Sequence, residues 1–453
     1  MRPRTMADVA RAVGGLLLGE DRVVSSIAID SRDVVAGGLF VALPGTRVDG
    51  HRFVQEAFDR GATGVLVRDG CTVDGPAVHV RGTAEALLRL AADERTRFTG
   101  TVVAITGANG KTSTKDMTAA VCETTFSTHA SPKSFNNEIG LPVTILGAPP
   151  DTEVIVAELG ARRPGDVALL CEVARPQVVV VTNVGLAHIE VFGSWDVIVE
   201  ASAEPVEALG EDGTAVLSAD DPVVAGYAGR GRGAVVTFGR STDADVRAEA
   251  VSLAADGLAS FDLVQGSARE RVGLTVPGEH MVMNALAAAA VGSVLGVPVE
   301  ARARALSSAT VSPWRMESFE TPSGVRVLND SYNANPESMA AALRTARWMA
   351  GEHRLIAVLG QMAELGVIAP REHERVGELA ARLRVDRLIT VGADAEPIAI
   401  ASVREGVEPD NVATYDDADD ALADVRAHAA PGDLVLLKAS RVAGLERLAE
   451  ALR

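Results

Sequence analysis

The middle of the chain alternates short β-branched apolar runs with segments in which apolar residues recur at helical spacing. The apolar runs lie at 101–106, 153–158, 177–182, 214–218 and 234–238. Runs of this length, bounded by glycine and polar turns, predict buried strands, and the segments between them predict crossover helices. The pattern indicates a mostly parallel sheet, in which functional side chains gather at the carboxyl ends of the strands.

Shorter alternations of the same kind precede and follow this central part. Before it, strands are expected at 27–29, 39–43 and 64–67, and helices at 53–60 and 84–96. After it, strands are expected at 325–328, 354–359, 387–391 and 434–437, and helices at 337–349, 371–383 and 418–428. A chain of 453 residues has room for about three domains. We therefore predict an α/β protein with a small α/β domain over 1–98, a central ATPase-type domain over 99–308, and a Rossmann-like doubly wound domain over 309–453.

Composition narrows the class of protein. The formal net charge of −18 argues against general nucleic-acid binding, so no nucleic-acid partner is expected. The three cysteines lack the spacing of a structural zinc site and suit a reducing compartment. The uncharged run 281–299 is nearly long enough to span a bilayer, but it is rich in alanine and contains Asn284 and Pro298, so we expect a buried helix. The first residues turn polar too soon for a secretory signal, and we expect a cytoplasmic protein without a membrane partner.

The candidate chemistry centres on a glycine loop that directly follows the run 101–106. The loop reads Thr-Gly-Ala-Asn-Gly-Lys-Thr over 106–112. Glycines after a strand, followed by Lys and Thr at a helix start, are typical of a loop whose backbone N–H groups hold phosphate. Lys111 would reach the terminal phosphates, and the Thr112 hydroxyl would bind Mg²⁺. Ile105 stands where the usual motif has its first glycine, so a glycine turn with an exposed lysine is the alternative interpretation.

Lysine usage supports a specific role for this loop. The chain contains four lysines, at 111, 115, 133 and 438, against 39 arginines. Because arginine is the default cation here, each lysine is a candidate for a task that a guanidinium group performs poorly.

Other polar side chains follow strands of the expected sheets. Glu158 and Asn183 end two central strands, and His188 lies five residues beyond Asn183. A lone Glu at a strand end is usually solvated or a cap, but beside a phosphate loop it is equally a candidate Mg²⁺ ligand. His188 taken alone is more often structural than a ligand. In the third domain, polar groups gather after strands at 329–336, 361–366 and 438–441, which is more than loops alone suggest.

Taken together, these motifs are similar to those of the Mur ligases, the ATP-dependent amide-forming enzymes of peptidoglycan synthesis. The resemblance covers the whole chain in three domains and is carried by residues 106–112, 135–140, 183–190, 329–336, 362–366 and 438–441. Within the family, the pattern most resembles the branch that adds D-alanyl-D-alanine to UDP-N-acetylmuramoyl-tripeptide. The resemblance implies a monomeric, ADP-forming ligase that works through an acyl phosphate. ATP and Mg²⁺ would be its cofactors, and a UDP-linked muramoyl peptide and an amino dipeptide would be its substrates.

The resemblance also implies roles for individual residues. Catalysis would rest on Lys111, His188 and Arg315. ATP would be held by Gly107, Asn109, Gly110, Lys111, Thr112, Ser113, His280, Asn284, Arg315, Asp330, Asn333 and Asn335. The metal ligands would be Thr112, Glu158 and His188. The UDP-linked and peptide substrates would meet Ser31, Arg32, Asp49, His51, Phe135, Asn136, Asn137, Lys438, Ser440 and Arg441.

Several positions depart from the family pattern (Lys133, Ser202, Met281, Gln361 and Ala439), and Ser202 bears most directly on the metal site. The central domain of the family usually carries a lysine that is carbamylated and helps to hold a second Mg²⁺, and an ungapped count from His188 places Ser202 there. A hydroxyl cannot carry the carbamate, and Glu200 and Glu204 are the nearby carboxylates that would substitute for it. Two alternatives therefore stay open: a related ligase that joins another carboxylate and amine in specialised metabolism, and a non-catalytic nucleotide-binding homologue.

Overall fold

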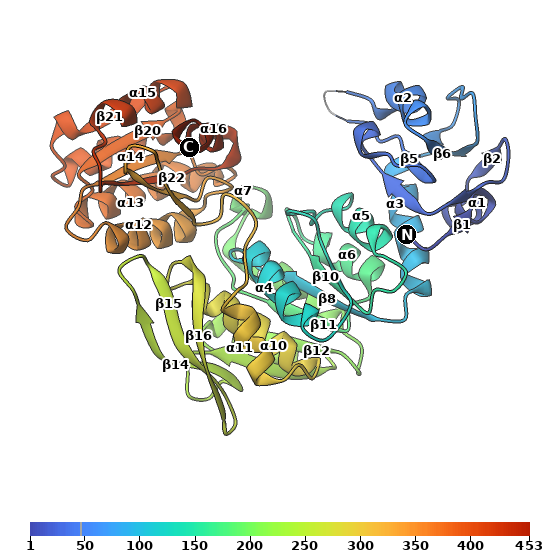
Figure 1. Cartoon of the computed structure of the whole chain (residues 1–453), viewed down its shortest axis with the longest axis horizontal. Coiled ribbons are helices and arrows are strands. Elements are labelled where there is room, and N and C mark those ends of the chain that lie inside the picture. Colours follow the sequence, from blue (N-terminus) through green and yellow to red (C-terminus); the bar gives the residue numbers. More distant parts are fainter. Residues whose placement is uncertain (46–47) are drawn as a thin grey trace.

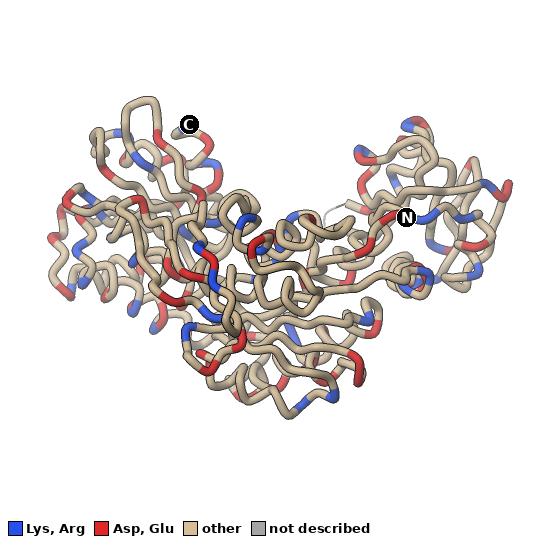
Figure 2. The backbone as a smooth tube through the Cα atoms, turned by 60° about the horizontal axis from the view of Figure 1, so that its bottom comes forward, with Lys and Arg blue, Asp and Glu red and all other residues tan. Residues whose placement is uncertain are grey.

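Three large sheets follow one another along the chain. The computed structural model describes residues 1–45 and 48–453, and each sheet lies in one of three consecutive units. The first unit, drawn in blue, and the last, drawn in red, lie on opposite sides of the central one (Figure 1). Lys and Arg positions are interspersed with Asp and Glu positions in all three units (Figure 2). The three-domain α/β fold is as predicted, while the boundaries after residues 98 and 308 stay a prediction.

The N-terminal unit contains a five-stranded sheet in the order β2-β7-β6-β5-β4, in which only β2 runs antiparallel to its neighbour. The strands of this unit are β1 (Arg4–Thr5), β2 (Leu16–Leu18), β3 (Val23–Val24), β4 (Ser26–Ala28), β5 (Gly38–Val41), β6 (Ala62–Arg68) and β7 (Ala77–Val80). The strands β1 and β3 pair with each other in a separate two-stranded sheet. The helices of this unit are α1 (Met6–Val13), α2 (Val54–Asp59) and α3 (Thr83–Arg97). The expected strands correspond to β4, β5 and β6, and the expected helices to α2 and α3.

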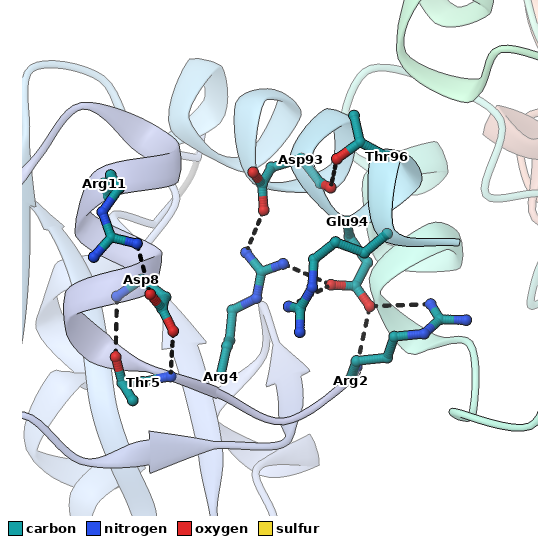
Figure 3. Close-up of polar contacts among 9 residues, drawn as sticks. Arg2, Arg4, Thr5, Asp8, Arg11, Asp93, Glu94 and Thr96 are labelled. Carbon is teal, nitrogen blue, oxygen red and sulfur yellow. Dashed lines mark hydrogen bonds and ion pairs between the residues drawn. The ribbon is translucent and has the colours of Figure 1, made fainter. Parts of the chain in front are cut away.

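A buried carboxylate ties the start of the chain to α3, the helix that leads into the central unit. Glu94 accepts hydrogen bonds from the backbone N–H of Arg2 and from the side chain of Arg4 (Figure 3). It also pairs with Arg97. The side chains of Arg4 and Glu94 are each only 1% exposed. Removing one partner of such a buried pair leaves an uncompensated charge and costs about 3–5 kcal/mol of stability.

The central unit has a nine-stranded sheet in the order β16-β15-β14-β13-β12-β11-β8-β10-β9. Its strands are β8 (Thr101–Thr106), β9 (Thr128–Ala130), β10 (Val154–Glu158), β11 (Val178–Val181), β12 (Thr214–Ser218), β13 (Ala234–Gly239), β14 (Val246–Leu253), β15 (Leu258–Gln265) and β16 (Ala268–Pro277). Its helices are α4 (Lys111–Glu123), α5 (Gly140–Gly147), α6 (Asp166–Ala174), α7 (Ile189–Phe192), α8 (Trp195–Glu207), α9 (Pro222–Ala225), α10 (Met281–Val294) and α11 (Val299–Leu306). Because β8 lies between β10 and β11, the glycine loop is flanked by the ends of both strands.

The antiparallel extension β14–β16 was not expected from the sequence. These strands alternate buried and exposed residues, so they lack the continuous apolar runs that marked the parallel strands. The expectation of one helix over 281–299 also needs correction. Gly296 adopts a left-handed conformation and Pro298 precedes α11, so the run divides into α10 and α11, with α10 buried as predicted. No helix within 1–45 and 48–453 is long and apolar enough to cross a membrane.

The C-terminal unit has a six-stranded sheet in the order β17-β18-β22-β19-β20-β21, parallel except for β17. Its strands are β17 (Glu317–Glu320), β18 (Arg326–Asn329), β19 (Leu355–Gly360), β20 (Arg387–Val391), β21 (Val412–Tyr415) and β22 (Leu434–Lys438). Its helices are α12 (Pro336–Ala350), α13 (Ala369–Arg382), α14 (Glu396–Arg404), α15 (Ala418–His428) and α16 (Leu445–Leu452). The neighbours β18, β22 and β19 bring together the three polar runs at 329–336, 438–441 and 361–366.

Candidate active site

The glycine loop connects β8 to α4, and its two glycines have no room for a side chain. Gly107 and Gly110 adopt φ angles of 133° and 78°, which strongly favour glycine. A Cβ atom on Gly107 would lie 2.1 Å from Thr182 Oγ1, and one on Gly110 would lie 2.3 Å from Asn284 Oδ1. The loop backbone is therefore free to approach a ligand at the start of α4, where unpaired N–H groups favour an anion.

Lys111, the first residue of α4, curls back over this loop. Its Nζ donates to the carbonyl oxygens of Gly107 at 2.6 Å and Ala108 at 3.2 Å. Burial lowers the pKa of this ammonium group, and Glu158 opposes that effect while Arg315 adds to it. The ammonium group is thus held over the glycine loop.

Asn109 fixes the loop to two other parts of the molecule. Its backbone N–H donates to Asn183 Oδ1 at 2.8 Å, and its carbonyl accepts from Asn183 Nδ2 at 3.0 Å. Its side-chain Oδ1 accepts from Asn335 Nδ2 at 2.7 Å, across the boundary to the C-terminal unit. Asn335 also caps α12. The loop therefore depends on both units for its shape.

A buried carboxylate lies beside the start of α4. Glu158 ends β10 and is 1% exposed; its Oε2 accepts from Thr112 Oγ1 at 2.6 Å and its Oε1 from Asn136 Nδ2 at 2.8 Å. Ser134 Oγ lies 3.0 Å from Thr112 Oγ1. A carboxylate and hydroxyls are the hard oxygen donors that Mg²⁺ prefers, so this donor set fits the ion.

His188 follows β11 and lies beside the glycine loop. It lines a cavity together with Lys111 and Ser202, so the serine faces the loop as the ungapped count implied. Burial lowers the pKa of His188, while its hydrogen-bond partner Glu364 opposes this effect. The imidazole is therefore favoured in its neutral form, which is the form that binds metal.

Neither of the two carboxylates near Ser202 takes the place of the missing family lysine. Glu200 is exposed and pairs with Arg230 at 2.6 Å. Glu204 accepts from the backbone N–H groups of Gly165 and Ala168, at 2.7 and 2.9 Å, at the start of α6. Both are thus engaged with other partners, and the expectation that one of them substitutes is not supported.

The C-terminal unit contributes Arg315 to the site. Its Nη2 donates to Ser134 Oγ at 2.9 Å, which joins the arginine to the hydroxyl pair at the start of α4. The guanidinium lies over the ring of Tyr332, 4.2 Å from its centroid. The guanidinium carbon of Arg441 lies 5.8 Å from the same centroid, so two predicted site residues lie near one aromatic ring.

The remaining predicted residues of the C-terminal unit form a second cluster. Lys438 Nζ donates to Asp330 Oδ2 at 2.6 Å and to the carbonyl of Asn333 at 2.9 Å. Ser440 Oγ accepts from the backbone N–H of Ala363 at 2.9 Å. The structure therefore brings the three strand ends together, as their order in the sheet requires.

Three predicted nucleotide contacts lie on or beside the helices behind the loop. His280 precedes α10, and burial lowers its pKa; Asp330 opposes this effect and Lys438 adds to it. Asn284 lies on α10 against Gly110, and Ser113 is buried on α4. Asn284 thus packs against the loop, and Ser113 lies in the first turn of the helix that follows it.

Two other predicted substrate residues have structural tasks. Asn137 Oδ1 accepts from the backbone N–H groups of Ile139 and Gly140, at 3.2 and 2.8 Å, at the start of α5. Phe135 packs against Gly140, where a Cβ atom would lie 2.6 Å from the Phe135 backbone. These contacts shape the loop that carries Asn136.

The predicted UDP-binding residues lie on the N-terminal unit, apart from the phosphate loop. Asp49 Oδ1 pairs with His51 Nδ1 at 2.6 Å, and His51 Nε2 accepts from the backbone N–H of Arg68. Ser31 Oγ donates to Glu56 at 3.2 Å. Arg32 pairs with Asp30 at 2.6 Å, and hydrogen bonds from this arginine lower the pKa of Asp30 to about 2.

Sequence reasoning missed three residues that the structure places in the site: Ser134, Tyr332 and Glu364. Each falls in or directly beside a motif that carries the family resemblance, but neither charge nor spacing distinguishes it there. Tyr332 and Glu364 act on side chains from other segments, so their contacts became visible only with the fold.

Comparisons with known proteins agree with this geometry. Three family models match consecutive parts of the chain: the Mur ligase family catalytic domain over 23–95, the Mur ligase middle domain over 105–292, and the Mur ligase glutamate ligase domain over 314–441. The UDP-N-acetylmuramoyl-tripeptide–D-alanyl-D-alanine ligase of Mycobacterium tuberculosis is 40% identical, with 99% of this chain and 97% of the relative covered. The enzyme of that name from Bacillus subtilis is 35% identical, with 100% and 99% covered.

Solved structures give the same result. MurF from Acinetobacter baumannii superposes with a TM-score of 0.88 at 28% identity, covering 99% of this chain and 98% of the other. MurF from Thermotoga maritima in complex with ADP gives 0.81 at 30% identity, covering 95% and 97%. The matched family domains and the full-length relatives place the chain in the class of ATP-dependent, ADP-forming ligases. The chain belongs to the Mur ligase family, as the motifs predicted.

Proposed function

We propose that this ligase joins D-alanyl-D-alanine to UDP-N-acetylmuramoyl-tripeptide, in the cytoplasm and as a monomer. The full-length similarity to two ligases of that name supports the pair of substrates. The observation that carries the proposal is the contact of Arg315 with Ser134, because Ser134 lies 3.0 Å from Thr112 and so joins the C-terminal unit to the start of α4. Two units that share one site are what a reaction with a nucleotide, an acid and an amine requires.

The reaction proceeds in two steps. The carboxylate oxygen attacks the γ-phosphorus of ATP, and the bond from that phosphorus to the β–γ bridging oxygen breaks. The products of this step are an acyl phosphate and ADP. The amine nitrogen then attacks the acyl carbon, the bond to phosphate breaks, and the amine loses a proton as the amide forms. An acyl phosphate hydrolyses in water, so closure of the two units protects it.

The first step needs charge neutralisation and positioning more than covalent help from the protein. Lys111 and the loop N–H groups would hold the β- and γ-phosphates, and Arg315 would approach the transferring group from the other side. Thr112 and Glu158 would hold one Mg²⁺, and His188 would help to hold a second; Mg²⁺ neutralises phosphate charge when bound.

The other predicted residues would bind the substrates. His280, Asn284, Asn333 and Asn335 would contact the nucleotide. Lys438, Ser440 and Arg441 would face the peptide substrates, and the N-terminal unit would bind the UDP portion through Ser31, Arg32, Asp49 and His51.

A second candidate function is a related ligase that joins a different acid and amine. The observation that favours it is Ser202 in the cavity beside Lys111 and His188, with both nearby carboxylates engaged elsewhere. Phosphate release from ATP and Mg²⁺, measured with the tripeptide substrate with and without D-alanyl-D-alanine, separates the two. Release that requires both substrates supports the first function, and a folded protein that binds ATP without releasing phosphate supports the second.

A further inference from the structure

Two residues with left-handed backbones meet where the central and C-terminal units touch. His188 follows β11 and has φ 60°, and Glu364 follows β19 and has φ 62°. Residues other than glycine rarely adopt this conformation, and they do so mainly where surrounding contacts impose it, often at functional sites. The two loops thus hold unusual conformations at their point of contact.

Three contacts fix this meeting point. The Glu364 carboxylate hydrogen-bonds to His188 Nδ1. The Glu364 carbonyl accepts from the backbone N–H of Glu190 at 3.2 Å. A Cβ atom on Gly366 would lie 3.1 Å from Glu190 Cβ, so the second loop packs closely on the first. The Glu364 carboxylate is thus held beside His188 by a backbone hydrogen bond and close packing of its own loop.

We propose that Glu364 is a positioning residue, which orients His188 and completes the metal site only when the C-terminal unit is docked. By accepting from Nδ1–H, the carboxylate selects the tautomer whose Nε2 carries the free lone pair. A carboxylate behind a histidine ligand fixes the ring and raises its basicity, and removing such a partner typically lowers metal affinity by about 10- to 100-fold. The inference rests on the metal role of His188 in the proposed function.

The chain offers a matched control at the same interface. Glu337, at the start of α12, accepts from the backbone N–H of Leu186 at 3.3 Å. It joins the same two units but makes this contact with a backbone group two residues before His188. Because this hydrogen bond is long and exposed, Glu337→Ala should leave docking almost unchanged, and it leaves the His188 ring with its partner.

The test measures Mn²⁺ binding to the full chain with saturating ADP, by electron paramagnetic resonance of the free ion. Glu364→Ala is expected to raise the Mn²⁺ Kd about 10- to 100-fold. The amide oxygen of Glu364→Gln still accepts from Nδ1–H, so the Mn²⁺ Kd of this variant is expected to lie between those of wild type and Glu364→Ala. The Mn²⁺ Kd of Glu337→Ala is expected to match that of wild type. In a His188→Ala background, Glu364→Ala is expected to add nothing.

Four outcomes would overturn the inference. Wild-type Mn²⁺ affinity in Glu364→Ala, or an equal loss in Glu337→Ala, shows that the carboxylate does not act through the ring. A further loss in the His188→Ala background shows the same. These results leave the proposed function intact, whereas a wild-type protein that binds ADP but no Mn²⁺ overturns the metal role of His188 and the inference with it.

Discussion

Tyr332 offers a quantitative test of how the C-terminal unit completes the active site. Its ring lies 4.2 Å from the guanidinium of Arg315, whose Nη2 donates to Ser134 on the central unit. The Nε of Arg315 is buried and has no hydrogen-bond partner within 1–45 and 48–453, so the ring is a main support for this side chain. We predict that Tyr332→Leu, which removes the ring, lets Arg315 leave the position that phosphoryl transfer requires.

The size of the effect follows from the contact. A cation over an aromatic ring and shielded from water gains about 1–2 kcal/mol. Since about 1.4 kcal/mol corresponds to a factor of ten in rate, kcat/KM for ATP should fall about 5- to 30-fold. Tyr332→Phe keeps the ring and should retain most of the activity.

The assay is ADP release at varied ATP, with the melting temperature of each variant as the control for folding. Equal kcat/KM values for the Leu and Phe variants would refute the reasoning, because only one of them keeps the ring. A loss that follows the melting temperature rather than the ring would refute it too.

Three further predictions concern the loop, the cavity and pH. Lys111→Met should lower ADP formation at least about 100-fold with the melting temperature unchanged, and retained turnover would contradict the role of the phosphate loop. Ser202→Lys should change the dependence of activity on Mg²⁺ and bicarbonate, and unchanged dependence on both would separate Ser202 from the metal site. Burial lowers the pKa of His373 below its usual 6.5, so the unfolded chain takes up the proton at a higher pH than the folded chain does. The free energy of unfolding is therefore unaffected by this group above about pH 6.5 and falls as the pH drops below that value. The melting temperature should therefore drop between about pH 7.5 and 5.5, and less so in His373→Gln, whose amide oxygen can still accept from the Met362 N–H; equal drops would contradict this.

The parallel strands and the glycine loop between β8 and α4 could be predicted because both are local in sequence. β8, the two glycines and the start of α4 form one continuous stretch, in which a buried run, a tight turn and a helix start each leave their own pattern. The sheet order could not be read in this way, and neither could β14–β16, whose alternating burial comes from one-sided packing.

The contacts between units could not be predicted from the sequence either. Glu364 and His188 are far apart in the chain, and nothing in either motif indicates that they meet. The same holds for Tyr332 and Arg315, where an aromatic residue in a polar run gave no sign that it supports a cation from another segment. Candidate ligand-binding residues can be identified from sequence motifs, whereas the residues that position them can be identified only once the fold is known.

The most direct test of the proposed reaction follows one oxygen atom. The tripeptide substrate is labelled with ¹⁸O in its reacting carboxylate, and the phosphate released with D-alanyl-D-alanine and ATP is analysed by mass spectrometry. If the carboxylate attacks the γ-phosphorus, one labelled oxygen appears in phosphate for each amide formed. Unlabelled phosphate released alongside the amide would contradict the acyl phosphate and the arrangement of Lys111 and Arg315 around it.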